Sequence, residues 1–165
     1  MNVPGTIPGE GPGDEAMKDA PSLSGLQALQ AMIDGGLPGP AIGRLMGFHI
    51  HKVEDGRAEF RGIPDDSVTN PAGTVHGGWY GAMLDSAMAC AVMTKIPAGT
   101  TYTTLEYKVN IIRPVPLGTH VAAIGVTDHV GRSTGIAHGE IRGLDDGRLY
   151  ATGSTTCIVM PMSRR

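Results

Sequence analysis

The sequence predicts an α+β domain in which an antiparallel β-sheet wraps around one long central helix. Residues 77–94 form an apolar run rich in Ala and Met, which is typical of a helix buried on most of its circumference. A hairpin pattern precedes this run, and four segments rich in β-branched residues follow it, at about 101–112, 119–127, 135–142 and 150–159. Strand-like segments on both sides of a single helix favour a sheet that curls around it.

Shorter elements precede the long helix. Four apolar side chains at helical spacing predict a short amphipathic helix from Leu23 that ends at Gly35-Gly36. A second helical turn is expected from Pro40 to Met46. From Phe48 the side chains alternate with the period of a strand, and the turn at Glu54-Asp55-Gly56 returns the chain as a β-hairpin. Pro64 to Gly73 is expected to be a loop.

Composition limits the class of protein. A chain of 165 residues with 41% hydrophobic residues is long enough for one core and too apolar to be disordered. We expect residues 1–21, rich in Gly and Pro, to form a flexible arm, and residues 22–165 to form a single domain. The net charge of −3 argues against nucleic acid as the main partner, and no stretch is apolar enough for a membrane span.

The two cysteines, Cys90 and Cys157, lie far apart in apolar surroundings, and the chain has no CxxC pair. Small buried thiols in a reducing cytoplasm are the simplest interpretation. The first twenty residues do not show the pattern of a secretory signal. His49 and His51 are close enough along a strand to share a metal, but no further ligand follows at a recognisable spacing, so no metal site is expected.

Asp85 is the most informative acidic residue. It lies more than two turns into the long helix, and its helical neighbours Gly81, Ala82, Met88 and Ala89 offer no polar partner. A carboxylate in such surroundings is costly to bury and its pKa should be raised, which makes it a candidate base or nucleophile. A solvent-facing position or a cap on a neighbouring element is the alternative.

Two glycines open the same helix, directly after His76. Bare N–H groups at Gly77 and Gly78 would suit a carbonyl oxygen that gains negative charge. A simple tight turn is the alternative for the pair. His76 either fixes the loop by hydrogen bonding or contacts a substrate, and Asn70 either initiates a turn or positions a water.

Together these residues form the string N-x-x-G-x-x-H-G-G, with Asp85 nine residues after the His. This string resembles the hotdog-fold acyl-CoA thioesterases of the PaaI-like, phenylacetate-pathway type. The resemblance continues through residues 104–110, Arg113-Pro114, Gly131-Arg132-Ser133 and residues 146–151, and it covers about residues 40 to 160. It implies the hotdog fold, an antiparallel sheet around a central helix.

The resemblance also implies roles for individual residues. Asp85 matches the family's catalytic acid, which acts as nucleophile or as general base on water. Gly77 matches the backbone N–H that polarises the thioester carbonyl, Asn70 a residue that orients the water or thioester, and His76 a supporting histidine. Thr104 falls near a hydroxyl that assists the water, with Thr103 as an alternative. Gly78 belongs to the substrate-binding helix start, and the family meets CoA at positions matching Gly131, Arg132 and Ser133.

We therefore expect a thioesterase that hydrolyses an acyl-CoA to a carboxylic acid and CoA without a metal or redox cofactor. A hotdog-fold hydratase or dehydratase is one alternative, and it would need a His base paired with an acid. A non-catalytic acyl-CoA-binding module is another, but it has little reason to keep Asp85 in an apolar stripe.

The spacing of Gly77 and Asp85 bears on the assembly. Eight residues of helix separate them by about 12 Å, too far for one thioester to meet both from the same helix. An antiparallel second copy would bring Asp85 of one subunit towards Gly77 of the other. The family resemblance likewise implies a homodimer, paired again into a homotetramer.

Overall fold

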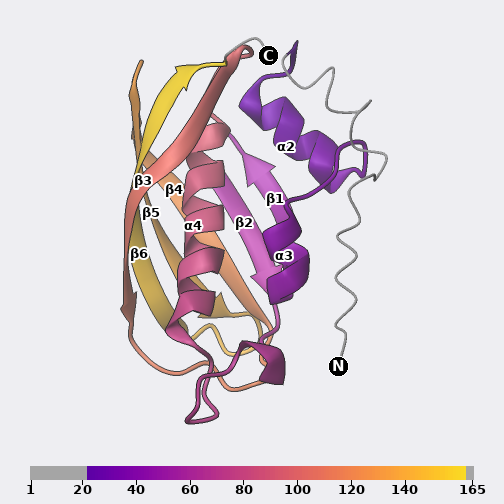
Figure 1. The fold of residues 1–165 in the computed structure, drawn as a ribbon, viewed down its shortest axis with the longest axis vertical. Helices are drawn as coiled ribbons and strands as arrows, with labels where there is room; N and C mark the ends of the chain where they lie inside the picture. Colours follow the sequence, from indigo (N-terminus) through magenta and orange to yellow (C-terminus); the bar gives the residue numbers. More distant parts are fainter. Residues whose placement is uncertain (1–21, 163–165) are drawn as a thin grey trace, which may run out of the picture.

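The computed structural model describes residues 22–162 of the chain, so the arm expected at residues 1–21 lies outside the described residues. The predicted architecture is confirmed: six antiparallel strands form one sheet, and a long helix packs against it (Figure 1). The elements are α2 (Gly25–Ile33), α3 (Ala41–Met46), β1 (Phe48–Glu54), β2 (Arg57–Gly62), α4 (Gly77–Met93), β3 (Thr100–Ile111), β4 (Val121–Val130), β5 (Thr134–Gly143) and β6 (Leu149–Pro161), with a 3-10 turn at Asp66–Val68.

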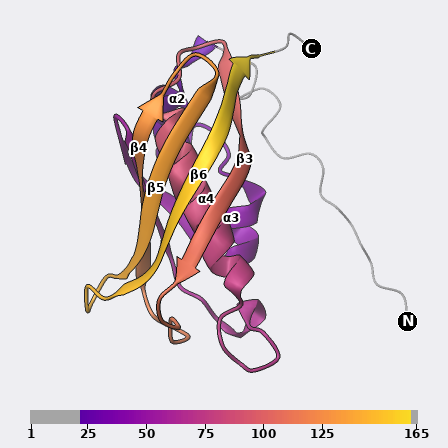
Figure 2. The same cartoon turned by 90° about the vertical axis from the view of Figure 1, so that its left-hand side faces the viewer.

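The strands lie in the order β1-β2-β4-β5-β6-β3, so β1 and β3 are the two edges of the sheet. Figure 2 shows β4, β5, β6 and β3 side by side, with α4 behind them. Helix α4 contacts all six strands, whereas α2 and α3 pack near β1. The α4 helix is therefore the central element that the sheet encloses on one side.

The core consists largely of α4 and the residues that face it from the sheet. Trp79, Tyr80, Met83, Leu84 and Met88 are fully buried on the helix. Burial of these large side chains on one helix supplies the apolar contact that holds helix and sheet together. No helix in residues 22–162 is long and apolar enough to cross a membrane.

Glycines on the inner face of the sheet let α4 approach it closely. A Cβ on Gly125 would lie 2.3 Å from the Ala87 carbonyl oxygen of the helix, and one on Gly135 would lie 2.4 Å from the Val92 side chain. At Gly139 the nearest atom would be the Met88 Cγ, at 2.8 Å. The helix therefore rests in a glycine-lined trough, defined by Gly125, Gly135 and Gly139, where no side chain fits.

Candidate active site

The hydrogen-bond partner of Asp85 lies on strand β3. The Thr104 hydroxyl of β3 donates a hydrogen bond to Asp85 Oδ1 over 2.8 Å, and both residues are half-buried. The helix itself supplies no polar neighbour to this carboxylate, as the sequence predicts. A contact between residues 19 positions apart therefore orients the candidate catalytic acid.

The electrostatic surroundings of Asp85 favour its protonated form. Burial raises the pKa of the Asp85 carboxyl above its usual range, and the Thr104 hydrogen bond offsets part of that shift. A carboxyl with a raised pKa is a better proton acceptor once ionised, which is the property that a general base needs near neutral pH.

A β-bulge decides which threonine faces Asp85. The register of β3 with β6 shifts between Thr104 and Glu106, so Leu105 is an extra residue. Bulges of this kind re-aim side chains and are common beside active sites. Here the bulge places Thr104 on the α4 side of β3, and Thr104 rather than Thr103 makes the contact.

The first turn of α4 presents one bare N–H group. His76 is the N-cap, and its Nδ1 accepts a hydrogen bond from the Gly78 N–H over 2.9 Å. The expectation that both glycine N–H groups are bare is therefore wrong for Gly78, because the histidine ring satisfies it. Within residues 22–162 no group accepts a hydrogen bond from the exposed Gly77 N–H. Gly77 is thus the donor that a ligand can reach.

Asn70 organises the loop that leads into this helix. Its Oδ1 accepts hydrogen bonds from the Ala72 and Thr74 N–H groups, at 2.9 and 3.3 Å, and its Nδ2 donates to the Thr74 hydroxyl. These bonds fit the first of the two interpretations of Asn70, the turn former. In this structure Asn70 and His76 shape the approach to Gly77 from the loop side.

Side chains of β3 follow α4 from Gly77 towards Asp85. A Cβ on Gly77 would lie 3.6 Å from Ile111 Cδ1, and one on Gly81 would lie 3.0 Å from the Tyr107 hydroxyl. Tyr107 is 47% exposed and lies midway between the two candidate groups. Sequence reasoning missed this contact, although Tyr107, Val109 and Ile111 are two residues apart along the strand and therefore share one face.

The Cys90 thiol is not a candidate nucleophile. Its Sγ lies 4.0 Å from the Tyr102 hydroxyl, and burial raises the pKa of the thiol to about 12. A thiol is reactive only as the thiolate, so this group is inert near neutral pH. Cys90 and Cys157 are both free, consistent with the expected thiols.

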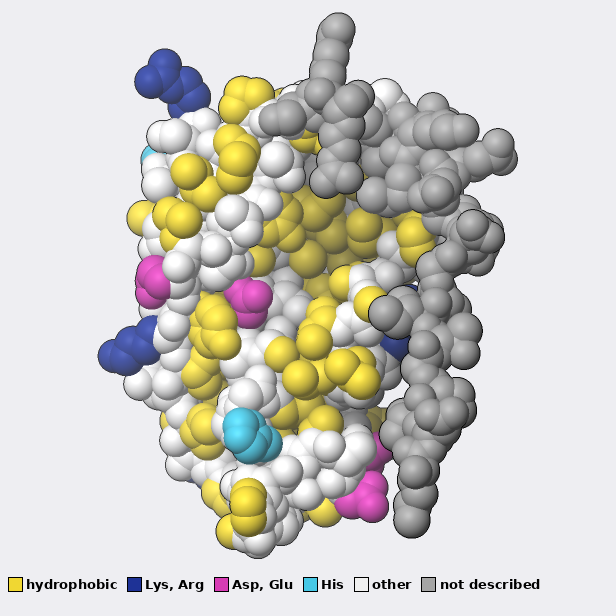
Figure 3. Space-filling model, viewed as in Figure 1, with side chains coloured by type: hydrophobic (Ala, Val, Ile, Leu, Met, Phe, Trp, Pro, Cys, Tyr) yellow, Lys and Arg dark blue, Asp and Glu magenta, His cyan; other side chains and the backbone are white. Residues whose placement is uncertain are grey.

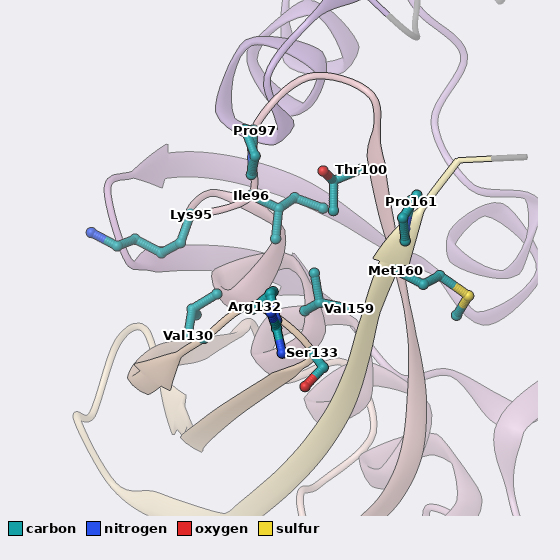
Figure 4. Close-up of a pocket in the computed structure, with 11 residues that line it drawn as sticks. Lys95, Ile96, Pro97, Thr100, Val130, Arg132, Ser133, Val159, Met160 and Pro161 are labelled. Atoms are coloured by element: carbon teal, nitrogen blue, oxygen red, sulfur yellow. The ribbon is translucent and has the colours of Figure 1, made fainter.

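Gly131, Arg132 and Ser133 form the turn between β4 and β5, away from Gly77. They line a pocket of about 540 Å³ beyond the C-terminal end of α4, together with Lys95, Ile96, Thr100 and Met160 (Figure 4). The 17-residue helix is about 25 Å long. Within one chain, the pocket and Gly77 are therefore separated by most of that length. The structure thus brings Asp85 and Thr104 together but places the two predicted binding regions at opposite ends of α4.

Comparisons with known proteins agree with this architecture. A family model described as the thioesterase superfamily matches residues 72–150. A phenylacetic acid degradation-related protein from Ralstonia eutropha is 31% identical, with 79% of this chain and 98% of that chain covered and a TM-score of 0.72. A variant of the phenylacetic acid degradation protein PaaI from Thermus thermophilus is 26% identical, with 72% of this chain and 98% of that chain covered and a TM-score of 0.65. The chain belongs to the thioesterase superfamily. It is a PaaI-like member with the hotdog fold.

A more distant likeness supports the fold alone. The PaaI protein of the Escherichia coli phenylacetic acid degradation operon is 20% identical, with 85% of this chain and 94% of that chain covered and a TM-score of 0.70. No curated protein matches the chain. The segment that matches the thioesterase family model contains His76, Gly77, Asp85 and Thr104, and Asn70 lies just outside it.

The Thr104 contact gives a prediction for the pH dependence of this thioesterase. The Thr104 hydrogen bond lowers the pKa of Asp85, so the Thr104→Val variant is expected to raise that pKa further. If the ionised carboxylate is the active form, the acidic limb of the pH–rate profile moves to higher pH. Thr104→Ser keeps the donor and should retain the parental limb. An unshifted limb in the valine variant contradicts a role for this hydrogen bond.

Proposed function

We propose that the protein is an acyl-CoA thioesterase that converts an acyl-CoA and water to a carboxylic acid and free CoA. The observation that carries the proposal is the half-buried Asp85 carboxyl, which accepts a hydrogen bond from Thr104 of β3. Asp85 lies on the same helix that opens with the bare Gly77 N–H. Membership of the thioesterase superfamily supports a thioester as the substrate.

The proposed chemistry uses these groups directly. The Gly77 N–H donates to the thioester carbonyl oxygen and stabilises the negative charge that develops there. In one route Asp85 takes a proton from the attacking water, and that proton passes to the sulfur as the C–S bond breaks and CoA leaves as the thiol. In the other route Asp85 attacks the carbonyl carbon itself and the C–S bond breaks. Water then hydrolyses the acyl–Asp anhydride, which releases the carboxylic acid, restores the Asp85 carboxylate and supplies the proton for the CoA thiol. Neither route calls for a metal or redox cofactor, so none is proposed.

The pocket at the β4–β5 turn is the proposed site for the CoA part of the substrate. Arg132 has no acidic partner within residues 22–162, so its guanidinium is available to a phosphate group. Lys95 also lines the pocket, although its ammonium pairs with Asp55 at 2.7 Å. Ser133 and the Gly131 backbone add polar groups beside the cation.

The active site is proposed to be shared between two copies of the chain. Strand β3 is a sheet edge of 12 residues, and its Leu105, Tyr107 and Ile111 side chains are exposed. Long apolar edges invite pairing with another strand. Hydrophobic side chains are spread over the face that carries α4 and β3 (Figure 3). Pairing of two β3 edges would set two α4 helices side by side and give a homodimer, with a homotetramer as the larger assembly.

The direct test is release of free thiol from a panel of acyl-CoAs, followed with a thiol-reactive dye. The proposal expects turnover with at least one aryl or aliphatic acyl group, and rates across the panel define the preferred one. Tight binding of acyl-CoAs without thiol release would instead favour a binding module. The free cysteines are consistent with a proposed location in the reducing cytoplasm.

Subunit mixing tests the shared site. Asp85→Ala subunits and Gly77→Pro subunits are each expected to be nearly inactive, and activity should partly return when the two are refolded together. The reason is that each heterodimer contains one site with both defects and one intact site. Activity of the refolded mixture, measured with heterodimer content by native mass spectrometry, is the readout. A mixture that forms heterodimers and stays inactive assigns each site to a single chain.

A further inference from the structure

Two buried aromatic residues directly follow the glycines at the start of α4. Trp79 and Tyr80 are each 1% exposed, and their rings meet edge to face with centroids 5.6 Å apart. These are the largest side chains in the core of a chain with few aromatic residues. Each also makes a long-range hydrogen bond.

The hydrogen bond of Tyr80 fixes the loop after β3. Its hydroxyl accepts the Val115 N–H over 2.8 Å, and Val115 is buried between Pro114 and Pro116. Proline has no N–H, so Val115 supplies the only backbone donor of this three-residue segment. The same loop begins just after Ile111, the side chain beside Gly77.

The hydrogen bond of Trp79 fixes the opposite side of the helix start. Its indole N–H donates to the Met46 carbonyl oxygen at the end of α3, over 2.9 Å. The first turn of α4 is therefore held between α3 and the loop after β3 by two buried side chains. The direction of a first-turn N–H follows the helix axis, so these contacts orient the Gly77 donor.

We propose that Trp79 and Tyr80 are positioning residues for the Gly77 N–H in thioester hydrolysis. The inference rests on the proposed function, in which this donor stabilises charge that appears only in the transition state. A displacement of about 1 Å in such a group can cost about 100-fold in rate. Loss of one of the two supports is therefore expected to lower kcat while the affinity for substrate changes little.

Tyr80→Phe removes only the hydroxyl and leaves the ring in place. We expect kcat to fall by about tenfold, because one of two supports remains, with KM within about twofold of the parent. Trp79→Phe removes the indole N–H from the other side and is expected to give the same split between kcat and KM. The second variant keeps the test decisive if the first folds poorly.

Tyr150→Phe is the matched control. Tyr150 is also buried, at 3% exposed, and its hydroxyl donates to Asp146 over 3.1 Å. Its loss should lower Tm by less than Tyr80→Phe does, because Asp146 is exposed whereas Tyr80→Phe leaves the buried Val115 N–H without an acceptor. In the control kcat should stay at the parental value.

The outcomes separate the inference from the proposed function. Absence of acyl-CoA hydrolysis by the parent protein overturns the proposed function and the inference with it. Hydrolysis by the parent together with parental kcat in Tyr80→Phe and Trp79→Phe overturns the inference alone. A fall in kcat that Tyr150→Phe shares in proportion to its loss of Tm also overturns it, because the effect is then one of general stability.

Discussion

Asp85→Asn is expected to lower kcat by about 100- to 10,000-fold, the range that a lost general base typically costs. The amide has nearly the same volume and still accepts the Thr104 hydrogen bond, but it takes up no proton and is a poor nucleophile. The measurement is thiol release at saturating acyl-CoA. A variant that hydrolyses thioesters at the parental rate excludes Asp85 as the catalytic acid.

The stability of the same variant provides its control. Because burial raises the pKa of Asp85, the native state binds this proton more tightly than the unfolded chain does. The stability of the parent therefore falls as pH rises from the unfolded pKa through the folded one. Asn carries no charge, so the Tm of Asp85→Asn at neutral pH should equal or exceed the parental value. A lower Tm would attribute the loss of activity to misfolding.

Gly77→Pro is expected to lower kcat by about 100- to 1,000-fold, the usual effect of removing one oxyanion donor. Proline lacks the N–H but suits the first position of a helix, and the extended His76 backbone, at ψ 139°, is compatible with a following proline. The cap from His76 to the Gly78 N–H is untouched. The variant thus removes one donor with little expected change in fold.

Gly77→Ala is the matched control for the proline variant. It adds the same Cβ, which would meet Ile111 Cδ1 at an ordinary 3.6 Å, and it keeps the N–H. Its kcat should lie near the parental value. Equal losses in the alanine and proline variants would show that the added carbon, rather than the missing donor, causes the defect.

The order of elements was predictable from the sequence because it depends on local patterns. The apolar run after His76 and the alternating segments after it correspond to α4 and to β3, β4, β5 and β6. Glycine pairs and proline loops marked the ends of these elements. Family motifs then indicated the hotdog fold, which the comparisons confirm.

The details of the candidate site were less predictable from the sequence. Plain alternation back from Tyr107 would put Leu105 and Thr103 on the α4 face, and the bulge at Leu105 shifts that place to Thr104. A bulge depends on how two strands pair, and the sequence of one strand alone does not determine this pairing. In the same way, the His76 contact that satisfies Gly78 depends on the turn of the chain before α4, not on residue type alone.

The glycine-lined trough under α4 has a consequence for how this protein tolerates mutation. Gly125, Gly135 and Gly139 lie on the far side of the helix from solvent and carry no chemistry, yet a methyl group at any of them would clash with the backbone or a side chain of the helix. Asp85 and Gly77 both belong to that helix, so any shift of the helix that relieves the clash moves them as well. We therefore expect substitutions at these three glycines to disturb the candidate active site, although none of them belongs to it.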